Sequence, residues 1–444
     1  MPQIFVDGST NTLPTCREIP MTTQSLRFTA CLLALALAHQ NQLPSAEAAR
    51  GLVPGTGTLI DYVGDTFEDT SWSFINNFPK SSREQDERLR SPTGRSTNGR
   101  WIEGPERGQP DHMKVVPNPA GALPGSQYGL SFRTLNSGIP GYRSNDVQQD
   151  DLISNCISRL GMSIPVRDMP SAVVRVYLPP ADQWENRSGP HFGFRISTST
   201  TVTERAEGRG FFASSRMETK SEPYWPGIWI HFKSKTSRKV EEDSAFLTIR
   251  GDRRGRDIRM KNIPADQFGW WTFGISATGD GQIHYYAKQG VENLTQEDFI
   301  TSQFPYSYSA ERFRTFFFNA CNKNDGRSWS TPFIIDDPQL FVVNSSRVVA
   351  NVKAKQEREA RRQAQKENRQ KKRTRKTAKR SSKKFATKTT TKKPSTKSVE
   401  TIVSNKRPKA KPSEPSTAVA TDLSIEPPEV ELTLKPATGV KLSR

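Results

Sequence analysis

Residues 270–290 show the clearest pattern of hydrophobic and polar positions in the chain, reading WWTFGISATGDGQIHYYAKQG. Hydrophobic residues occupy every second position from 271 to 277 and again from 283 to 287, the period of a half-buried β-strand. The two runs flank Asp280-Gly281, and an Asp-Gly pair between alternating runs is a strong signal for a hairpin. The pattern predicts an antiparallel hairpin at the centre of an all-β domain.

Seven other segments have the short hydrophobic or alternating runs of strands, with turn-forming residues between them. One further segment, 150–160, has hydrophobic residues at helical spacing and predicts a short helix. Many short strands with few helices predict a two-sheet jelly-roll sandwich over residues 58–345. The strand segments are 128–133, 172–178, 191–197, 228–233, 245–250, 313–321 and 333–343, the last interrupted by Pro338.

The net charge of the chain lies entirely in its C-terminal part. Residues 347–444 contain 28 Lys and Arg against 9 Asp and Glu, which accounts for the whole net charge of +19. Only 33% of the 444 residues are hydrophobic, which is low for a fully folded chain. We therefore expect residues 346–444 to form a disordered Lys/Arg-rich tail, within which 347–379 has the composition of a transient helix.

The N-terminal part resembles an export signal. Residues 21–48 combine Arg27, a hydrophobic stretch over 28–38, and the small-x-small sequence Ala46-Glu47-Ala48, which predicts a signal peptide cleaved after Ala48. The alternative is a buried core helix. On the first interpretation, residues 1–20 are an over-extended start, 49–57 are a linker, and the exported chain is secreted, periplasmic or on the cell surface, without a transmembrane segment.

Two cysteines, Cys156 and Cys321, remain after such a cleavage. An even pair in an exported protein predicts one disulfide bond that closes a long loop. The alternative is two buried free thiols.

The hairpin and the closing strand carry a resemblance to a known family. Trp271 opening a strand, Asp280-Gly281 at the turn, Tyr286 in the return strand and FIIDDPQLF over 333–341 resemble the concanavalin A-like lectin/glucanase superfamily, which includes laminin-G-type domains. This resemblance implies a jelly roll whose concave face holds saccharide. The Glu-x-Asp-x-x-Glu strand of its retaining glucanases is missing here, which argues against hydrolysis by that route.

A second resemblance concerns Gln282-Ile283-His284, which is similar to the Gln-Ile-His motif of alginate-lyase-type jelly rolls. It implies a polysaccharide lyase that acts on uronic-acid polymers. On that alternative, the outward strand residues that would act are His284, Tyr286 and Arg250. In such a reaction, Arg neutralises the uronate carboxylate while His or Tyr transfers protons.

The outward positions of the predicted strands give one candidate site. Trp and Tyr rings can stack on sugars, and Arg and His can bind hydroxyl, carboxylate or sulfate groups. The set therefore predicts a carbohydrate-binding face, with a lyase site or an ordinary solvated sheet face as alternatives. Its members are Arg195, Trp229, His231, Arg250, His284 and Tyr286.

The sequence contains no zinc-binding motif, because its five histidines are scattered and no Cys-x-x-Cys occurs. The superfamily resemblance implies a possible structural calcium ion. Oxygen donors of the right kind are Asp65, Asp336 and Asp337, with Glu68 and Asp69 close to the first of them.

The composition of residues 347–444 is similar to that of a histone-like basic tail. Such a segment binds polyanions by releasing counterions. For an exported protein the expected partners are sulfated or uronic polysaccharides and anionic wall or surface polymers. The whole sequence thus predicts a secreted, lectin-like protein that is not an enzyme, with a polysaccharide lyase as the alternative. A nucleic-acid-binding protein ranks third, because it requires the signal peptide to be wrong.

Overall fold

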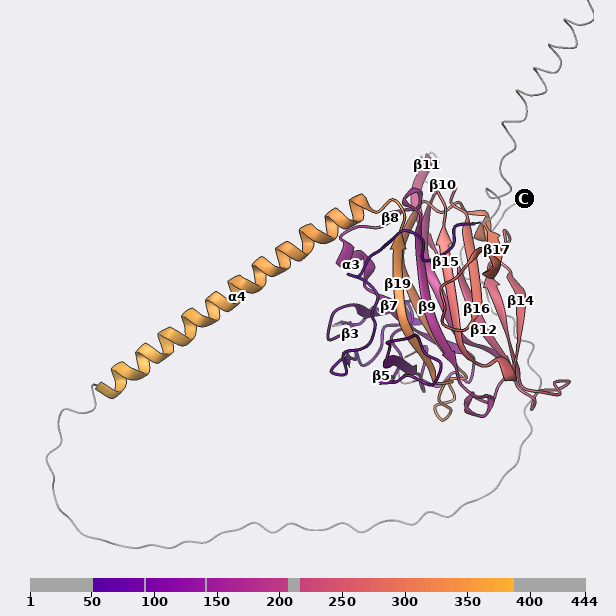
Figure 1. The fold of residues 1–444 in the computed structure, drawn as a ribbon, viewed down its shortest axis with the longest axis horizontal. Coiled ribbons are helices and arrows are strands. Elements are labelled where there is room, and N and C mark those ends of the chain that lie inside the picture. The colour runs from indigo at the N-terminus through magenta and orange to yellow at the C-terminus, as the bar shows by residue number, and fades with distance from the viewer. Residues whose placement is uncertain (1–50, 92, 140–141, 207–215, 387–444) are drawn as a thin grey trace, which may run out of the picture. The chain divides into compact units, whose positions relative to one another are not determined.

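The computed structural model describes residues 51–91, 93–139, 142–206 and 216–386 (Figure 1). The predicted start segment, the signal peptide and the part of the predicted tail beyond 386 lie outside these residues. The chain divides into two compact units, Met1–Gln370 and Lys371–Arg444. The first unit contains both β-sheets.

One sheet has eight antiparallel strands in the order β17-β16-β15-β9-β19-β6-β5, with β1 paired to β19. The predicted hairpin is confirmed as β15–β16, in which Trp271 faces Gln289 and Ala277 faces Ile283. The strands are β1 (Thr58–Leu59), β5 (His112–Pro117), β6 (Tyr128–Arg133), β9 (Pro170–Leu178), β15 (Gly269–Ala277), β16 (Ile283–Gln289), β17 (Phe299–Gln303) and β19 (Phe333–Val342).

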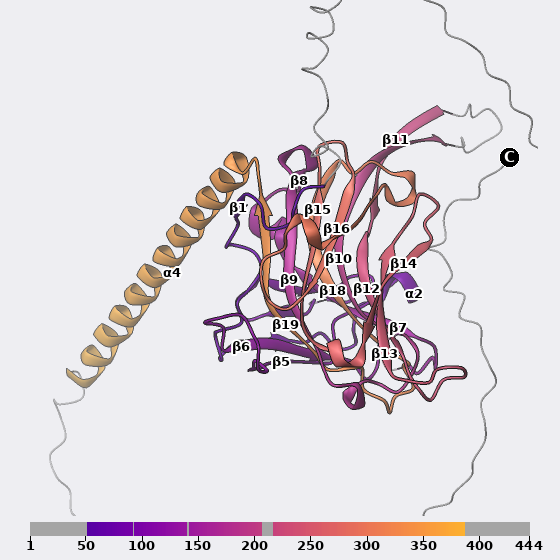
Figure 2. The ribbon, with the colours of Figure 1, turned by 45° about the vertical axis from the view of Figure 1, so that its right-hand side comes forward.

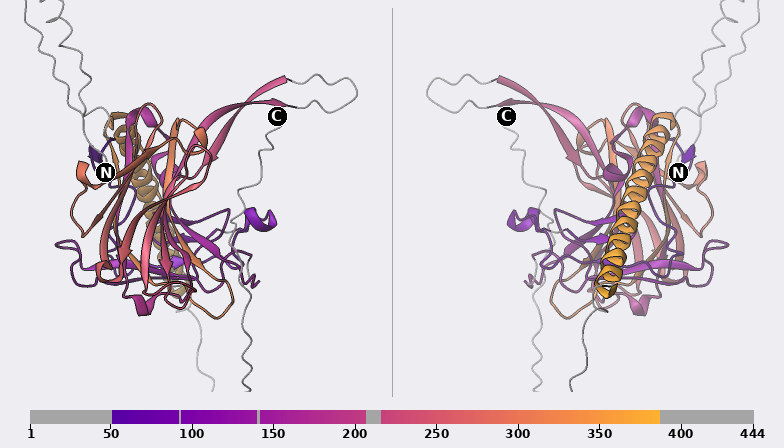
Figure 3. Two further views of the ribbon diagram at one scale, coloured as in Figure 1. Left: turned by 90° about the vertical axis from the view of Figure 1, so that its right-hand side faces the viewer. Right: turned by 90° about the vertical axis from the view of Figure 1, so that its left-hand side faces the viewer.

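The other sheet has eleven strands in the order β14-β13-β12-β10-β18-β7-β4-β3-β2, with β11 paired to β10 and β8 paired to β18. Figure 3 shows the β10–β11 pair extending past the rest of the sheet. The strands are β2 (Phe74–Ile75), β3 (Arg95–Ser96), β4 (Trp101–Glu103), β7 (Gln148–Ser154), β8 (Ile164–Pro165), β10 (Gly189–Ala206), β11 (Arg216–Tyr224), β12 (Gly227–Lys233), β13 (Ser244–Arg250), β14 (Asp257–Pro264) and β18 (Arg312–Asn322).

The two sheets pack face to face around one hydrophobic core, as Figure 2 shows for the layers. Alternation decides which residues enter the core, because successive side chains of a strand point to opposite faces. Phe132 and Phe333 from one sheet pack against Phe192 and Phe318 from the other, and all four are buried. The predicted all-β, two-sheet jelly-roll architecture is confirmed.

Two local predictions differ from the structure. Residues 150–160 do not form one helix: β7 runs to Ser154, and only Cys156–Leu160 forms the short helix α3. The reason is pairing, since β7 lies hydrogen-bonded between β18 and β4. Pro338 does not break β19 but lies in an irregularity between Asp336 and Gln339, after which pairing with β9 resumes.

The predicted disulfide bond is wrong, because Cys156 and Cys321 are both free and buried. Cys321 faces Gln149 across the β18–β7 pair. The extended strand β7 then separates this point from Cys156 by roughly 15 Å or more, whereas a disulfide needs α-carbons within about 7 Å.

The sandwich is followed by helix α4 (Ser346–Ala386), where we expected a disordered tail with a transient helix over 347–379. Its first turns contact the sandwich: Val348 is buried, and Arg347 forms an ion pair with Asp168 at 2.8 Å. A short helix of four residues, α2 (Arg83–Asp86), lies in the segment between β2 and β3. No helix in the described residues is long and apolar enough to cross a membrane.

Candidate functional site

The six predicted site residues do not share one face. Arg195 on β10, Trp229 and His231 on β12, and Arg250 on β13 belong to the eleven-stranded sheet. His284 and Tyr286 on β16 belong to the eight-stranded sheet. All six point away from the core, so the two sheets place them on opposite sides of the sandwich. The predicted common face is wrong because β16 pairs with β15 and β17 and not with β12 or β13.

Residues 51–55 cover the outer face of the eight-stranded sheet at β16, so His284 and Tyr286 are buried. The hydroxyl of Tyr286 donates a hydrogen bond to the Gly51 carbonyl at 2.6 Å. A β-carbon on Gly51 would lie 2.1 Å from the His284 ring, so the backbone rests directly on it. Burial lowers the pKa of His284 to about 4 and raises the pKa of Tyr286 to about 12. Both groups are therefore neutral at physiological pH. Tyr286 holds the segment by its hydrogen bond, while the two ring nitrogens of His284 bond the Thr278 and Ser302 hydroxyls.

On the other side, pairing brings together charged, polar and aromatic side chains from five strands, β7, β10, β12, β13 and β18. Arg250 faces Gly227, Gly227 faces Arg195, and Arg195 faces Phe317, which places two arginines in one row across the sheet. A neighbouring row contains the set Thr248, Trp229, Gly193, Asn319 and Asp151. We call the five residues Arg195, Trp229, Arg250, Asn319 and Asp151 the guanidinium face.

Gly193 allows the side chains on either side of it in the second row to pack closely. A β-carbon at this position would lie 2.6 Å from the Asn319 Oδ1 atom and 3.0 Å from the Trp229 ring. Any larger residue would push these two side chains apart. The glycine therefore sets the spacing of the guanidinium face.

Arg195 is the unusual member of this face because it is only 7% exposed. Its Nε and Nη2 atoms both donate to the Trp225 carbonyl, at 3.2 and 2.8 Å. Its guanidinium lies 5.3 Å from the ring centres of Trp229 and of Phe317. In the described part of the chain no carboxylate forms an ion pair with it. Burial, with help from the nearby Arg250 and Arg107 charges, lowers its pKa to about 10.

The other charges of the face have partners. Arg250 forms a two-point ion pair with Asp257, both bonds 2.8 Å long, and lies 5.9 Å from the Trp229 ring centre. Asp151 accepts a hydrogen bond from Asn319 Nδ2 at 2.5 Å, and burial raises the pKa of its carboxyl group. Arg195 is thus the cation of the face without a direct ion pair, although the Asp151 carboxylate partly offsets the effect of burial on its pKa.

Two further polar groups on the face are buried without hydrogen-bond partners. They are Trp229 Nε1, which is a donor, and Asn319 Oδ1, which is an acceptor. Unpaired polar groups of this kind are costly to bury. Together with Arg195, they offer a cation, a donor and an acceptor whose hydrogen bonds the protein does not complete.

His231 lies at the margin of the face, where its Nε2 atom bonds the Thr248 hydroxyl at 3.0 Å. Its ring stacks on Phe246 with ring centres 4.9 Å apart. Burial lowers its pKa to about 4, so it carries no charge near neutral pH.

Tyr306 adds a group that the sequence did not suggest. Its backbone has φ 60°, and its amide donates to the Asp252 carbonyl at 3.0 Å. Its hydroxyl is close enough to Arg195 and Arg250 to act on the pKa of both guanidinium groups. At 36% exposure, it is the most open aromatic residue beside the face. Backbone strain of this kind is concentrated at functional sites in proteins.

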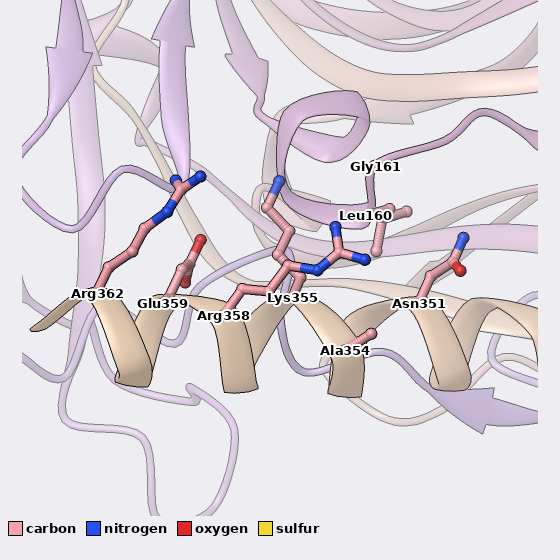
Figure 4. Close-up of a pocket in the computed structure, with 8 residues that line it drawn as sticks. All are labelled: Leu160, Gly161, Asn351, Ala354, Lys355, Arg358, Glu359 and Arg362. Atoms are coloured by element: carbon pink, nitrogen blue, oxygen red, sulfur yellow. The ribbon is translucent and has the colours of Figure 1, made fainter. Parts of the chain in front are cut away.

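A separate crevice of about 350 Å³ lies between α3 and α4 (Figure 4). It is lined by Leu160 and Gly161 on one side, and Figure 4 shows Lys355, Arg358 and Arg362 projecting from the same side of α4. The carboxylate beside them, Glu359, accepts a hydrogen bond from the Tyr62 hydroxyl. The crevice is therefore basic.

The carboxylates considered for calcium do not form the expected site. Asp65 accepts hydrogen bonds from Asn98 and Trp101, and Asp337 pairs with Arg175 at 3.2 Å. Only Asp336 keeps a buried oxygen without a partner. Among the described residues, no group of three or more His, Cys, Asp or Glu side chains is arranged to hold a metal ion. The residues present do not fit calcium as the sequence predicted it.

Comparison with known proteins gives only distant likenesses. No family model and no curated protein matches this chain. A carbohydrate esterase of the Shiga toxin-encoding bacteriophage phi24B aligns with TM-score 0.32 and 9% identity, covering 61% of this chain and 99% of that chain. Alginate lyase AlyC3 in complex with dimannuronate aligns with TM-score 0.28 and 7% identity, covering 48% and 74%. The Ca²⁺- and mannose-bound lumenal domain of VIP36 aligns with TM-score 0.28 and 10% identity, covering 64% and 91%. At TM-scores this low, the likenesses carry no argument about the function of this chain.

Proposed function

We propose that this protein binds an acidic saccharide on the outer face of its eleven-stranded sheet. The observation that carries the proposal is Arg195, a buried guanidinium that no carboxylate contacts directly and on which the Asp151 charge acts only from a distance. A buried charge is costly unless it is paired. Arginine also matches the planar geometry of carboxylate and sulfate groups. A uronate carboxylate or a sugar sulfate would complete the ion pair that the protein leaves open.

The surroundings of Arg195 suit a sugar as the carrier of that anion. Trp229 Nε1 and Asn319 Oδ1, a donor and an acceptor without protein partners, lie buried just beneath Arg195 and add polar character to this part of the sheet. Tyr306 presents a partly exposed ring next to both arginines. Arg250, whose side chain is 27% exposed, supplies a second cation that attracts an approaching anion towards Arg195.

The lyase alternative needs His284, Tyr286 and Arg250 around one substrate. The first two lie on the eight-stranded sheet beneath residues 51–55, whereas Arg250 lies on the other sheet. A shared reaction centre requires groups within hydrogen-bond reach of the same sugar. These three residues do not meet that condition, so saccharide binding is the function that the geometry supports best.

Titration calorimetry with defined oligosaccharides tests the proposal. We expect binding of uronic or sulfated oligomers, no binding of neutral ones, and at least about tenfold weaker binding in Arg195→Met, which is about 1.4 kcal/mol. Arg133→Met is the matched control, since Arg133 also lies over a tryptophan and donates to a carbonyl, but on the eight-stranded sheet. Equal affinity for neutral and acidic oligomers, or an unchanged Arg195→Met, contradicts the proposal. Release of an unsaturated uronate product in the same mixtures would identify a lyase instead.

For the exported protein we further propose that α4 binds polyanions such as sulfated or uronic wall polymers. Between Arg347 and Lys376 there are 13 Lys and Arg residues against 3 Glu. Most of them are exposed, and the crevice beside α3 gathers three of these cations. Regularly spaced cations on a helix bind polyanions by releasing counterions.

Heparin affinity as a function of salt concentration tests the role of α4. We expect the logarithm of the binding constant to fall linearly with the logarithm of the salt concentration. Replacing Lys355, Arg358 and Arg362 by Gln should make the slope shallower, while Arg133→Met should leave it unchanged. A salt-independent affinity contradicts the counterion mechanism.

A further inference from the structure

A second unusual group of charges surrounds Lys80, beside strand β7 of the eleven-stranded sheet. This lysine is buried, with a side chain only 3% exposed, and Asp150 beside it is fully buried. The distance from Lys80 Nζ to Asp150 Oδ2 is 2.5 Å. Ion pairs of this type normally have N···O distances of about 2.7–2.9 Å. The two groups are therefore in direct contact where water has little access.

A third group, Asp111, completes the cluster. Its Oδ1 atom lies 2.8 Å from Lys80 Nζ. Its Oδ2 atom accepts hydrogen bonds from the backbone amides of Leu135 and Asn136, both 2.8 Å long. Bonds to the charged form stabilise a carboxylate. Asp111 is thus held with one oxygen directed at the lysine, in position to accept its proton.

Asp150 differs from Asp111 in its surroundings. Its Oδ2 atom accepts from Lys80 and from the Thr134 hydroxyl, but its Oδ1 atom is buried without a partner. Burial raises the pKa of its carboxyl group to about 7, so a large fraction is neutral at physiological pH. A neutral carboxylic acid accepts attack by an amine, whereas a carboxylate resists it.

From this geometry we propose that Lys80 and Asp150 condense to form an isopeptide bond within the folded chain. Asp111 removes one proton from the Lys80 ammonium, and the resulting amine attacks Cγ of protonated Asp150. The bond from Cγ to Oδ2 breaks as the proton released by the attacking nitrogen passes to Oδ2, which leaves as water. The new amide keeps one N–H, and Asp111 retains the proton it accepted. No oxidant, reductant or cofactor is required.

Several features of the site favour this condensation. Fixed positions give two groups a very high effective concentration. The near absence of water protects the new amide from hydrolysis. The side chain of Asp111 is 14% exposed, so the released water molecule and the proton that Asp111 has accepted can reach solvent on this side. The reaction also removes two ionisable groups, the Lys80 amine and the Asp150 carboxyl, from a buried place where their charged forms are costly.

The bond would join two parts of the chain that are far apart in sequence. Lys80 lies in the irregular segment that follows β2, and Asp150 lies on β7. Segment 79–108 has few regular hydrogen-bonded strands of its own. A covalent link to β7 would fasten it to the sheet next to the guanidinium face. This inference does not depend on the saccharide proposal.

Intact mass measurement of the purified full chain tests the inference. We expect a mass lower than the sequence mass, after any N-terminal processing, by one water molecule. After denaturation, trypsin should fail to cut after Lys80 and should release one branched peptide joining the Lys80 and Asp150 regions. Lys80→Met should have its full sequence mass.

Asp111→Asn keeps both reacting groups and removes the proton acceptor, so we expect it to remain mostly unlinked while its circular dichroism stays that of a folded β-protein. If this variant does not fold, Lys80→Met supplies the unlinked reference. A wild-type chain that is folded, has its full mass and is cut after Lys80 overturns the inference and leaves an ordinary buried ion pair. Loss of water without a branched peptide also overturns it, since a succinimide at Asp150 has the same mass.

Discussion

Replacing Arg195 by Met should separate stability from binding. The pKa of this side chain is lowered from 12.5 to about 10, mainly by burial. At about 1.4 kcal/mol per pKa unit, this opposes the charged form by about 3 kcal/mol. The substitution loses the bonds to the Trp225 carbonyl and two contacts with aromatic rings, together about 2 kcal/mol. We therefore expect Arg195→Met to be as stable as the wild type or more stable by about 1 kcal/mol.

Urea unfolding followed by tryptophan fluorescence measures this difference, with Arg133→Met as the control for losing a guanidinium over a tryptophan. The charge at position 195 should stabilise the protein only when an acidic oligosaccharide is present. The ligand should therefore raise the urea concentration at the unfolding midpoint for the wild type and not for Arg195→Met. A loss of more than about 2 kcal/mol in ligand-free Arg195→Met would show that the protein itself compensates the charge. That result would remove the reason for expecting an anionic ligand.

Three other outcomes follow from the structure. Gly193→Ala should destabilise the protein by about 1–3 kcal/mol because its β-carbon overlaps the facing asparagine amide, whereas Gly279→Ala, with its nearest neighbour atom 3.7 Å away, should be nearly neutral in thermal melts. The pKa of His284 is lowered to about 4, so the unfolded chain binds a proton that the folded chain does not between pH 6.5 and 4. The free energy of unfolding should fall as the pH decreases through this interval. His284→Asn should remove about 3 kcal/mol of this fall, whereas His112→Asn, at an exposed position, should leave it unchanged. Parallel pH profiles of the unfolding free energy for wild type and His284→Asn would contradict the assignment. N-terminal sequencing of the secreted protein should begin at Ala49, and recovery of residues 21–48 in the secreted protein would refute the signal peptide.

The sequence predicted which side of each strand faces the core but not which sheet each strand joins. The alternation in β16 correctly placed Tyr285 inside and His284 and Tyr286 outside. Alternation is a property of one strand, whereas strand order depends on pairings between residues far apart in the chain. For this reason Arg195 and Arg250 were correctly grouped with Trp229, and the two β16 residues were wrongly added to them.

The sequence pattern did not single out four residues that the structure brings forward, and in each case the reason lies in the local sequence. Asp151 lies in a segment whose hydrophobic spacing is also that of a helix, so its outward direction on β7 was not visible. Asn319 interrupts the run FFFNAC at an alternate position of β18, which is a signal that could have placed it on the outer face. Tyr306 and Lys80 lie in irregular segments, where no periodicity indicates direction.

The contact between Gly51 and the β16 side chains has a practical consequence for recombinant work. Only Ala49 and Arg50 would precede Gly51 after the predicted cleavage, and the Gly51 carbonyl accepts hydrogen bonds from Tyr286 and Gln296. A purification tag fused at this end would be anchored against the sheet, and a chain shortened to begin at residue 56 would open His284 to solvent. Affinity handles therefore belong elsewhere, and trimming for crystallisation should stop before Gly51.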